Sequence, residues 1–94
     1  MPVYLIERNF AEKLEENREN TDRIKQINTD VGVQWLISFL SADKKKTYCL
    51  YEASDPEAIR EAARQVGVPA DVIIEVGELR STGETGEVVR QRFV

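Results

Sequence analysis

The sequence predicts an α+β domain of the ferredoxin-like kind, a βαββαβ sandwich in which two helices cover one face of a four-stranded sheet. Strand-forming segments and helical patterns follow one another in the order strand, helix, strand, strand, helix, strand, which is the order of a split βαβ unit. The two middle strands are joined by a connection short enough for a hairpin, and right-handed crossovers place both helices on the same face. At 94 residues the chain has the length of a single domain.

The N-terminal part predicts one strand and one helix. The strand is expected within residues 1–10, where apolar strand formers lie close together. Residues 11–20 are charged and short of apolar side chains, so we expect a loop. The helix is expected over 21–31, because Asn20 is a suitable N-cap and Gly32 lies where a helix stops.

The middle of the chain predicts an antiparallel hairpin. Its strands are expected over 33–40 and 46–53, with the turn between them at 41–45. Side chains alternate between the two faces of a strand. Strict alternation over the first of these strands therefore puts four apolar side chains on one face: Val33, Trp35, Ile37 and Phe39.

The second helix carries the clearest boundary signals. Asp55 is a capping residue, Pro56 suits the first helical position, and Gly67 ends the apolar stripe. The last strand is expected over 72–76, where four of the five residues are Val or Ile.

Residue composition predicts two regions. We expect the ferredoxin-like domain to occupy residues 1–79 and a C-terminal tail to occupy 80–94. The tail is rich in Gly, Ser, Thr and Glu as far as residue 87, which is typical of a linker. Residues 88–94 would then form a short edge strand or remain loose.

Both faces of the expected sheet are apolar. In the first strand Val3 and Leu5 point one way and Tyr4 and Ile6 the other. Two helices cover only one face, and the other would leave a patch of the kind that marks an interface. We therefore expect a homodimer in which two open sheet faces meet about a two-fold axis. The alternative is that the tail folds over the open face.

The composition argues against a nucleic-acid partner and against a membrane. The net charge is −4, the pI is about 4.9, and the one basic run is residues 44–46, whereas a nucleic-acid surface needs a basic patch. No apolar run is long enough for a bilayer span, and no leader pattern is present. The single cysteine allows no intrachain disulfide, so we expect a reducing, cytoplasmic setting.

Four side chains are candidates for lining a ligand cleft between sheet and helices: Glu7, Trp35, Cys49 and Tyr51. Glu7 is an acid in an apolar strand, and the alternative is that it is solvated or paired at the strand end. Cys49 is alternatively a small buried hydrophobe, and Trp35 and Tyr51 alternatively pack in the core or at the dimer interface. We predict no catalytic residue, metal ligand or cofactor, because the chain lacks histidine, a CxxC pair and a Gly-rich phosphate loop.

Three segments resemble the small bacterial DUF4242 family, some members of which are described as nickel-binding: VYLIERNF, GVQWLISFLSADKKKTYCLYEASDPEAIREAAR and VPADVIIEV. The most specific stretch is residues 47–64, and the resemblance covers about residues 2–79. It implies a ferredoxin-like fold and a homodimer, and it implies no established catalytic activity. Many members carry histidines where this chain has Ile37 and Ala62, so we do not carry nickel binding over to this chain.

These observations favour a small dimeric, non-catalytic module that binds a small ligand. One alternative is a metal-binding protein like the family members, which the missing histidines weaken. The other is a cofactor-poor enzyme of the dimeric α/β-barrel kind, which requires Glu7, Cys49 and Tyr51 to converge in one pocket.

Overall fold

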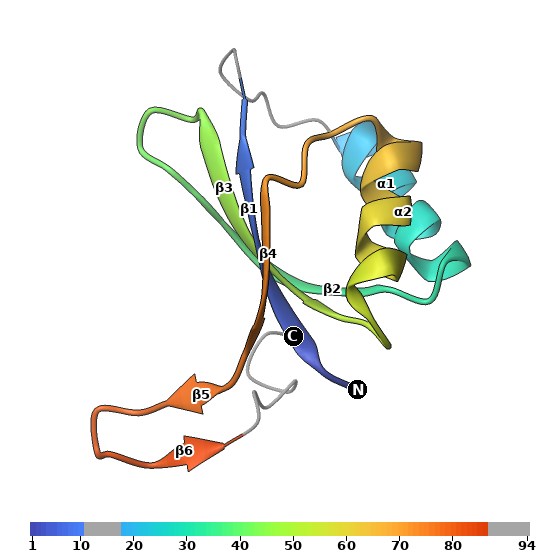
Figure 1. The fold of residues 1–94 in the computed structure, drawn as a ribbon. Coiled ribbons are helices and arrows are strands. Elements are labelled where there is room, and N and C mark those ends of the chain that lie inside the picture. Colours follow the sequence, from blue (N-terminus) through green and yellow to red (C-terminus); the bar gives the residue numbers. More distant parts are fainter. Residues whose placement is uncertain (11–17, 87–94) are drawn as a thin grey trace.

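The computed structural model describes residues 1–10 and 18–86, and it confirms the predicted α+β fold (Figure 1). The elements of the sandwich are β1 (Val3–Asn9), α1 (Arg18–Asp30), β2 (Gln34–Leu40), β3 (Lys46–Glu52), α2 (Pro56–Val66) and β4 (Val72–Val76). The sheet has the antiparallel order β2-β3-β1-β4, and both helices lie on one side of it. Neither helix is long and apolar enough to cross a membrane.

Helix α2 is bounded by the signals that its sequence carries. The Asp55 side chain accepts a hydrogen bond of 3.0 Å from the backbone N–H of Ala58, which satisfies one of the free donors of the first turn. Gly67 ends the helix with φ at 83° and donates its N–H to the carbonyl of Ala63. This left-handed conformation is open to glycine at little cost.

Helix α1 begins earlier than the capping pattern predicts. It covers Arg18–Asp30 instead of 21–31, so Asn20 lies inside the helix and is not its N-cap. Arginine and glutamate at positions 18 and 19 are good helix formers, and they extend the helix past the position that the cap signal favours. Most of the expected 11–20 loop lies outside the described residues.

Strand β2 does not alternate strictly, which corrects the predicted face. Trp35 pairs with Tyr51, but the register then shifts, so that Ile37 pairs with Leu50. Such a bulge gives one strand an extra residue and reverses the side on which later side chains lie. Trp35 therefore shares the helix-covered face with Tyr51, whereas Ile37 and its neighbour Phe39 lie on the opposite, open face.

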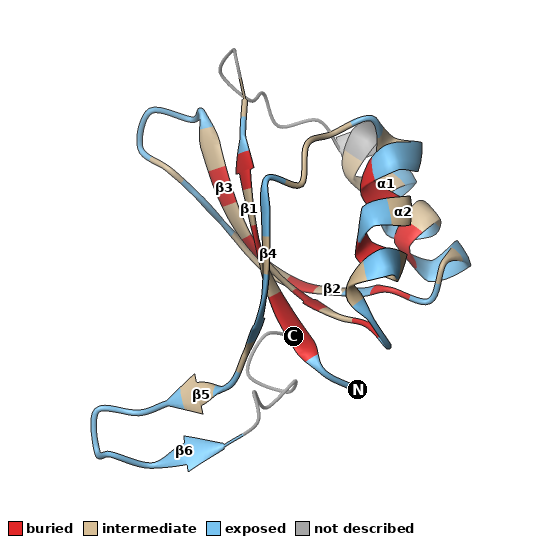
Figure 2. Cartoon of the chain, viewed as in Figure 1, coloured by how far each residue is buried: buried red, intermediate tan, exposed pale blue. Residues whose placement is uncertain are grey.

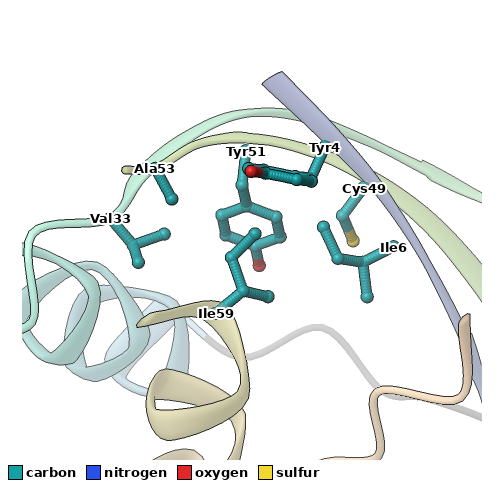
Figure 3. Packing of buried hydrophobic residues seen from close by; sticks show 7 residues of the cluster. All are labelled: Tyr4, Ile6, Val33, Cys49, Tyr51, Ala53 and Ile59. Atoms are coloured by element: carbon teal, nitrogen blue, oxygen red, sulfur yellow. The ribbon is translucent and has the colours of Figure 1, made fainter. Parts of the chain in front are cut away.

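The core lies between the sheet and the helices. Figure 2 shows buried residues along β1 and β3 and on both helices. Figure 3 shows how the central side chains gather between the sheet and α2. They form one cluster of buried residues: Tyr4, Ile6, Val33, Cys49, Tyr51, Ala53 and Ile59.

The segment after β4 is not the simple linker that its composition predicts. Strands β5 (Glu78–Leu79) and β6 (Thr85–Gly86) pair as an antiparallel hairpin, which projects away from the four-stranded sheet (Figure 1). The hairpin turns at Gly83, where φ is 88°. Glycine is favoured in such turns because it adopts a positive φ at no steric cost. The hairpin spans the predicted boundary at residue 79, and the expected edge strand at 88–94 lies outside the described residues.

Candidate functional site

The interior contains a group of polar side chains that we call the polar cluster: Arg8, Asn28, Thr47 and Tyr51. Each is at most 6% exposed. Arg8 and Thr47 are directly opposite each other in the β1–β3 ladder, and Tyr51 follows four residues later on the same face of β3. Asn28 reaches the cluster from α1. The cluster therefore joins the two central strands to a helix.

Three atoms of the polar cluster have no hydrogen-bond partner. They are the Arg8 Nε, the Asn28 Nδ2 and the Thr47 Oγ1. A buried polar atom left without a partner costs about 1–3 kcal/mol, and the large majority of such atoms in native proteins have one. These three atoms make the polar cluster the candidate functional site among the described residues.

Tyr51 lies at the centre of the polar cluster. The guanidinium carbon of Arg8 lies 5.4 Å from the centre of the Tyr51 ring, which is cation–π distance. Burial raises the pKa of Tyr51 to about 12, and the charge of Arg8 and polar interactions with Arg8 and Asn28 offset only part of this rise. The hydroxyl is therefore protonated at neutral pH and able to donate a hydrogen bond.

A second chain of contacts runs beside the polar cluster and includes two predicted site residues. The indole N–H of Trp35 donates to the Ser38 hydroxyl at 2.7 Å, and that hydroxyl donates to the sulfur of Cys49 at 2.9 Å. The Trp35 and Tyr51 rings are stacked, with centroids 6.4 Å apart. Trp35, Cys49 and Tyr51 are thus brought together on the helix-covered face, away from the open face.

Glu7, the fourth predicted cleft residue, lies on the other face of the sheet, which corrects the predicted set. It pairs with Tyr48 and Val72 in the ladders, and its carboxylate lies 3.9 Å from the Lys46 ammonium. Because side chains alternate along β1, Glu7 points to the face away from its neighbours Ile6 and Arg8. The constellation of Glu7, Cys49 and Tyr51 that an enzyme would require is therefore not formed.

Three members of the polar cluster, Arg8, Asn28 and Thr47, are not among the four predicted cleft residues. The signal for Arg8 was its position two residues after Ile6 and four after Tyr4, on one face of the strand. Asn28 lies four residues after Ile24, along the apolar stripe of α1. A polar side chain within an apolar stripe indicates a buried polar site only when the structure shows that this side chain is buried.

These features define a class: a small α+β sandwich with a buried polar cluster between its sheet and its helices. Within this class, residues 4–76 match the family described as "Nickel responsive protein SCO4226-like", and the chain belongs to that family. The assignment is compatible with the resemblance to DUF4242. The hairpin of β5 and β6 lies beyond the matched residues.

One solved structure supports the fold independently. The chain is similar to the crystal structure of SCO4226 from Streptomyces coelicolor A3(2), with a TM-score of 0.62 and 19% sequence identity. The match covers 79% of this chain and 94% of that chain. No curated protein matches the chain.

The family description raises the question of a nickel site, and the described residues show no cluster of side chains that would hold one. Over residues 1–10 and 18–86, no three histidine, cysteine or acidic side chains gather closely enough to hold a metal ion. Ile37 pairs with Leu50 on the open face, and Ala62 is buried in α2. Cys49 contributes a lone sulfur, which already accepts a hydrogen bond from Ser38.

Proposed function

We propose that the protein is a non-catalytic module that binds a small ligand at the polar cluster and acts as a homodimer. The observation that carries this proposal is that three buried polar atoms of the polar cluster, the Arg8 Nε, the Asn28 Nδ2 and the Thr47 Oγ1, have no hydrogen-bond partner. A bound molecule would satisfy them and offset their cost, which is about 1–3 kcal/mol each. Binding sites of this kind have apolar walls and a few convergent polar groups, as the surroundings of Tyr51 do.

The contacts around the thiol and the carboxylate favour binding over catalysis. A nucleophilic cysteine needs a base or a cation that lowers its pKa. The contact that the structure gives the Cys49 sulfur is a serine hydroxyl, Ser38. Glu7 is paired with Lys46 on the opposite face of the sheet. Neither group is arranged to move a proton to or from a molecule held at Tyr51.

The homodimer is proposed from the open face of the sheet. The strand registers place nine apolar side chains there: Val3, Leu5, Ile37, Phe39, Tyr48, Leu50, Val72, Ile74 and Val76. Phe39 is 54% exposed and Ile74 is 50% exposed. Burying a side chain of this size contributes about 1.5–3 kcal/mol, so pairing two such faces about a two-fold axis would stabilise a dimer.

Nickel binding is the second candidate, and the family description is the observation that favours it. The absence of histidine from the sequence weighs against it, because imidazole is a preferred ligand of nickel.

Native mass spectrometry of the untagged protein, with and without added nickel, tests the proposal. We expect a dimer that retains a small additional mass, which is lost on denaturation, and no stoichiometric uptake of nickel. A dimer that takes up nickel stoichiometrically would favour the second candidate. A bare chain without any retained or acquired mass would contradict ligand binding, and a monomer at micromolar concentration would contradict the dimer.

A further inference from the structure

We infer that the polar cluster recognises a small monocarboxylate; this inference rests on the proposed function and specifies its ligand class. The starting point is the charge of Arg8. Arg8 is 6% exposed, and it forms no ion pair with any of the described carboxylates. A buried charge is costly unless it is paired. The ordinary partners of a buried guanidinium are anions with oxygen acceptors.

The groups around Arg8 are rich in donors. The Arg8 Nε and the Asn28 Nδ2 both carry hydrogen and both lack an acceptor. The Tyr51 hydroxyl is protonated at neutral pH, as in any tyrosine, and burial raises its pKa further. The Thr47 hydroxyl is free to donate as well as to accept. The unpartnered donors of Arg8 and Asn28 therefore need acceptor atoms, and the charge of Arg8 needs one negative charge.

A carboxylate supplies both requirements. Its two oxygens match the planar fork of a guanidinium and leave lone pairs for further donors such as Asn28. Water would accept the same hydrogen bonds but would leave the charge of Arg8 unbalanced. A dianion would bring one charge more than Arg8 neutralises into an apolar surrounding formed by Ile6, Cys49 and Ile59. One charge for one arginine predicts a monoanion.

The test compares acetate with acetamide, a neutral molecule of nearly the same shape. Each is titrated into the untagged protein in chloride-free buffer, with the sodium concentration matched by sodium sulfate. The readouts are the melting temperature and the NMR signal of the Arg8 Nε–H group, which is identified by its loss in Arg8→Lys. Lysine keeps the charge but lacks the fork. Arg60→Lys is the matched control, because Arg60 lies on the exposed face of α2 and pairs with Glu57.

We expect acetate to shift the Arg8 signal saturably and to raise the melting temperature beyond the rise that sulfate gives at the same sodium concentration, because sulfate stabilises folded proteins without binding a specific site. Acetamide and sulfate should leave the Arg8 signal unchanged. Arg8→Lys should weaken acetate binding by about tenfold or more, because it loses the bidentate geometry. Arg60→Lys should bind acetate like the unaltered protein. Circular dichroism of both variants without ligand verifies that they are folded.

Two results would contradict a carboxylate ligand. They also show whether the proposed ligand-binding function fails with it. An equal response to acetamide would assign a neutral ligand to the polar cluster, and the binding module would stand. An Arg8 signal that stays unchanged with acetate, acetamide and sulfate, with the Arg8 Nε–H exchanging with water as in surface arginines, would show a hydrated cluster. The retained mass in native mass spectrometry then decides whether the protein binds another ligand elsewhere.

Discussion

At the scale of single residues, Tyr51 links the packing of the core to the chemistry of the polar cluster. Its ring stacks with Trp35 and lies against the Arg8 guanidinium, and its side chain is 4% exposed. Burial disfavours the phenolate and raises the pKa to about 12, against about 10 for an unfolded chain. The folded state therefore holds the Tyr51 proton over a pH range in which the unfolded state releases it.

This difference predicts a pH dependence of stability. Below pH 10 Tyr51 is protonated in both the folded and the unfolded state, and its contribution to the free energy of unfolding is fully present. This contribution is lost as the pH rises from 10 to 12. One pKa unit corresponds to about 1.4 kcal/mol, so the free energy of unfolding should fall by roughly 2–3 kcal/mol through this group. Urea unfolding of the protein and of Tyr51→Phe between pH 9 and pH 12 measures the difference, in which the other titrating groups cancel. Parallel curves would contradict the assignment.

At the scale of elements, helix α2 depends on its caps. The Asp55 carboxylate accepts from the Ala58 N–H at 3.0 Å. Asp55→Ala should lower the free energy of unfolding by about 1 kcal/mol, because an orphan donor of the first turn loses its partner. Ser54→Ala is the matched control, since Ser54 is exposed beside the cap. Chemical denaturation of both variants makes the comparison, and equal stability would contradict the role of the cap.

The elements also show which parts of the fold the sequence predicts. The bounds of α2 and β4 agree with prediction, because a cap, a terminal glycine and a run of β-branched residues are local signals. The bulge in β2 has no such signal: residues 34–38 contain no glycine or proline, and the shift arises from pairing with β3. The predicted face of Ile37 was wrong for this reason.

The candidate site could also be predicted only where local patterns place its residues. Cys49 and Tyr51 could be placed together, because residues two apart in a strand share a face. Glu7 was grouped with them although alternation separates it from Ile6 and Arg8. Asn28 comes from a helix that is distant in sequence, and its place depends on how α1 packs on the sheet, which no local pattern specifies.

At the scale of the whole molecule, the open face of the sheet is the proposed contact between two copies. Ile74→Lys introduces a charge at the middle of β4, in a side chain that is 50% exposed on this face. Burying an unpaired charge is costly, so the dissociation constant of the dimer should rise by about tenfold or more. Leu79→Lys is the control, because Leu79 is 76% exposed on the β5–β6 hairpin. Analytical ultracentrifugation measures both, and an unchanged dimer in Ile74→Lys would contradict this interface.

The proposed function depends on a bound molecule that completes the polar cluster. A high-resolution crystal structure of the untagged protein would reveal this molecule, because the density beside Arg8, Asn28 and Thr47 shows what satisfies their side chains. We expect a molecule other than water, with an acceptor within hydrogen-bond distance of the Arg8 Nε and the Asn28 Nδ2. Side chains that pair with one another, or waters alone at these positions, would contradict it.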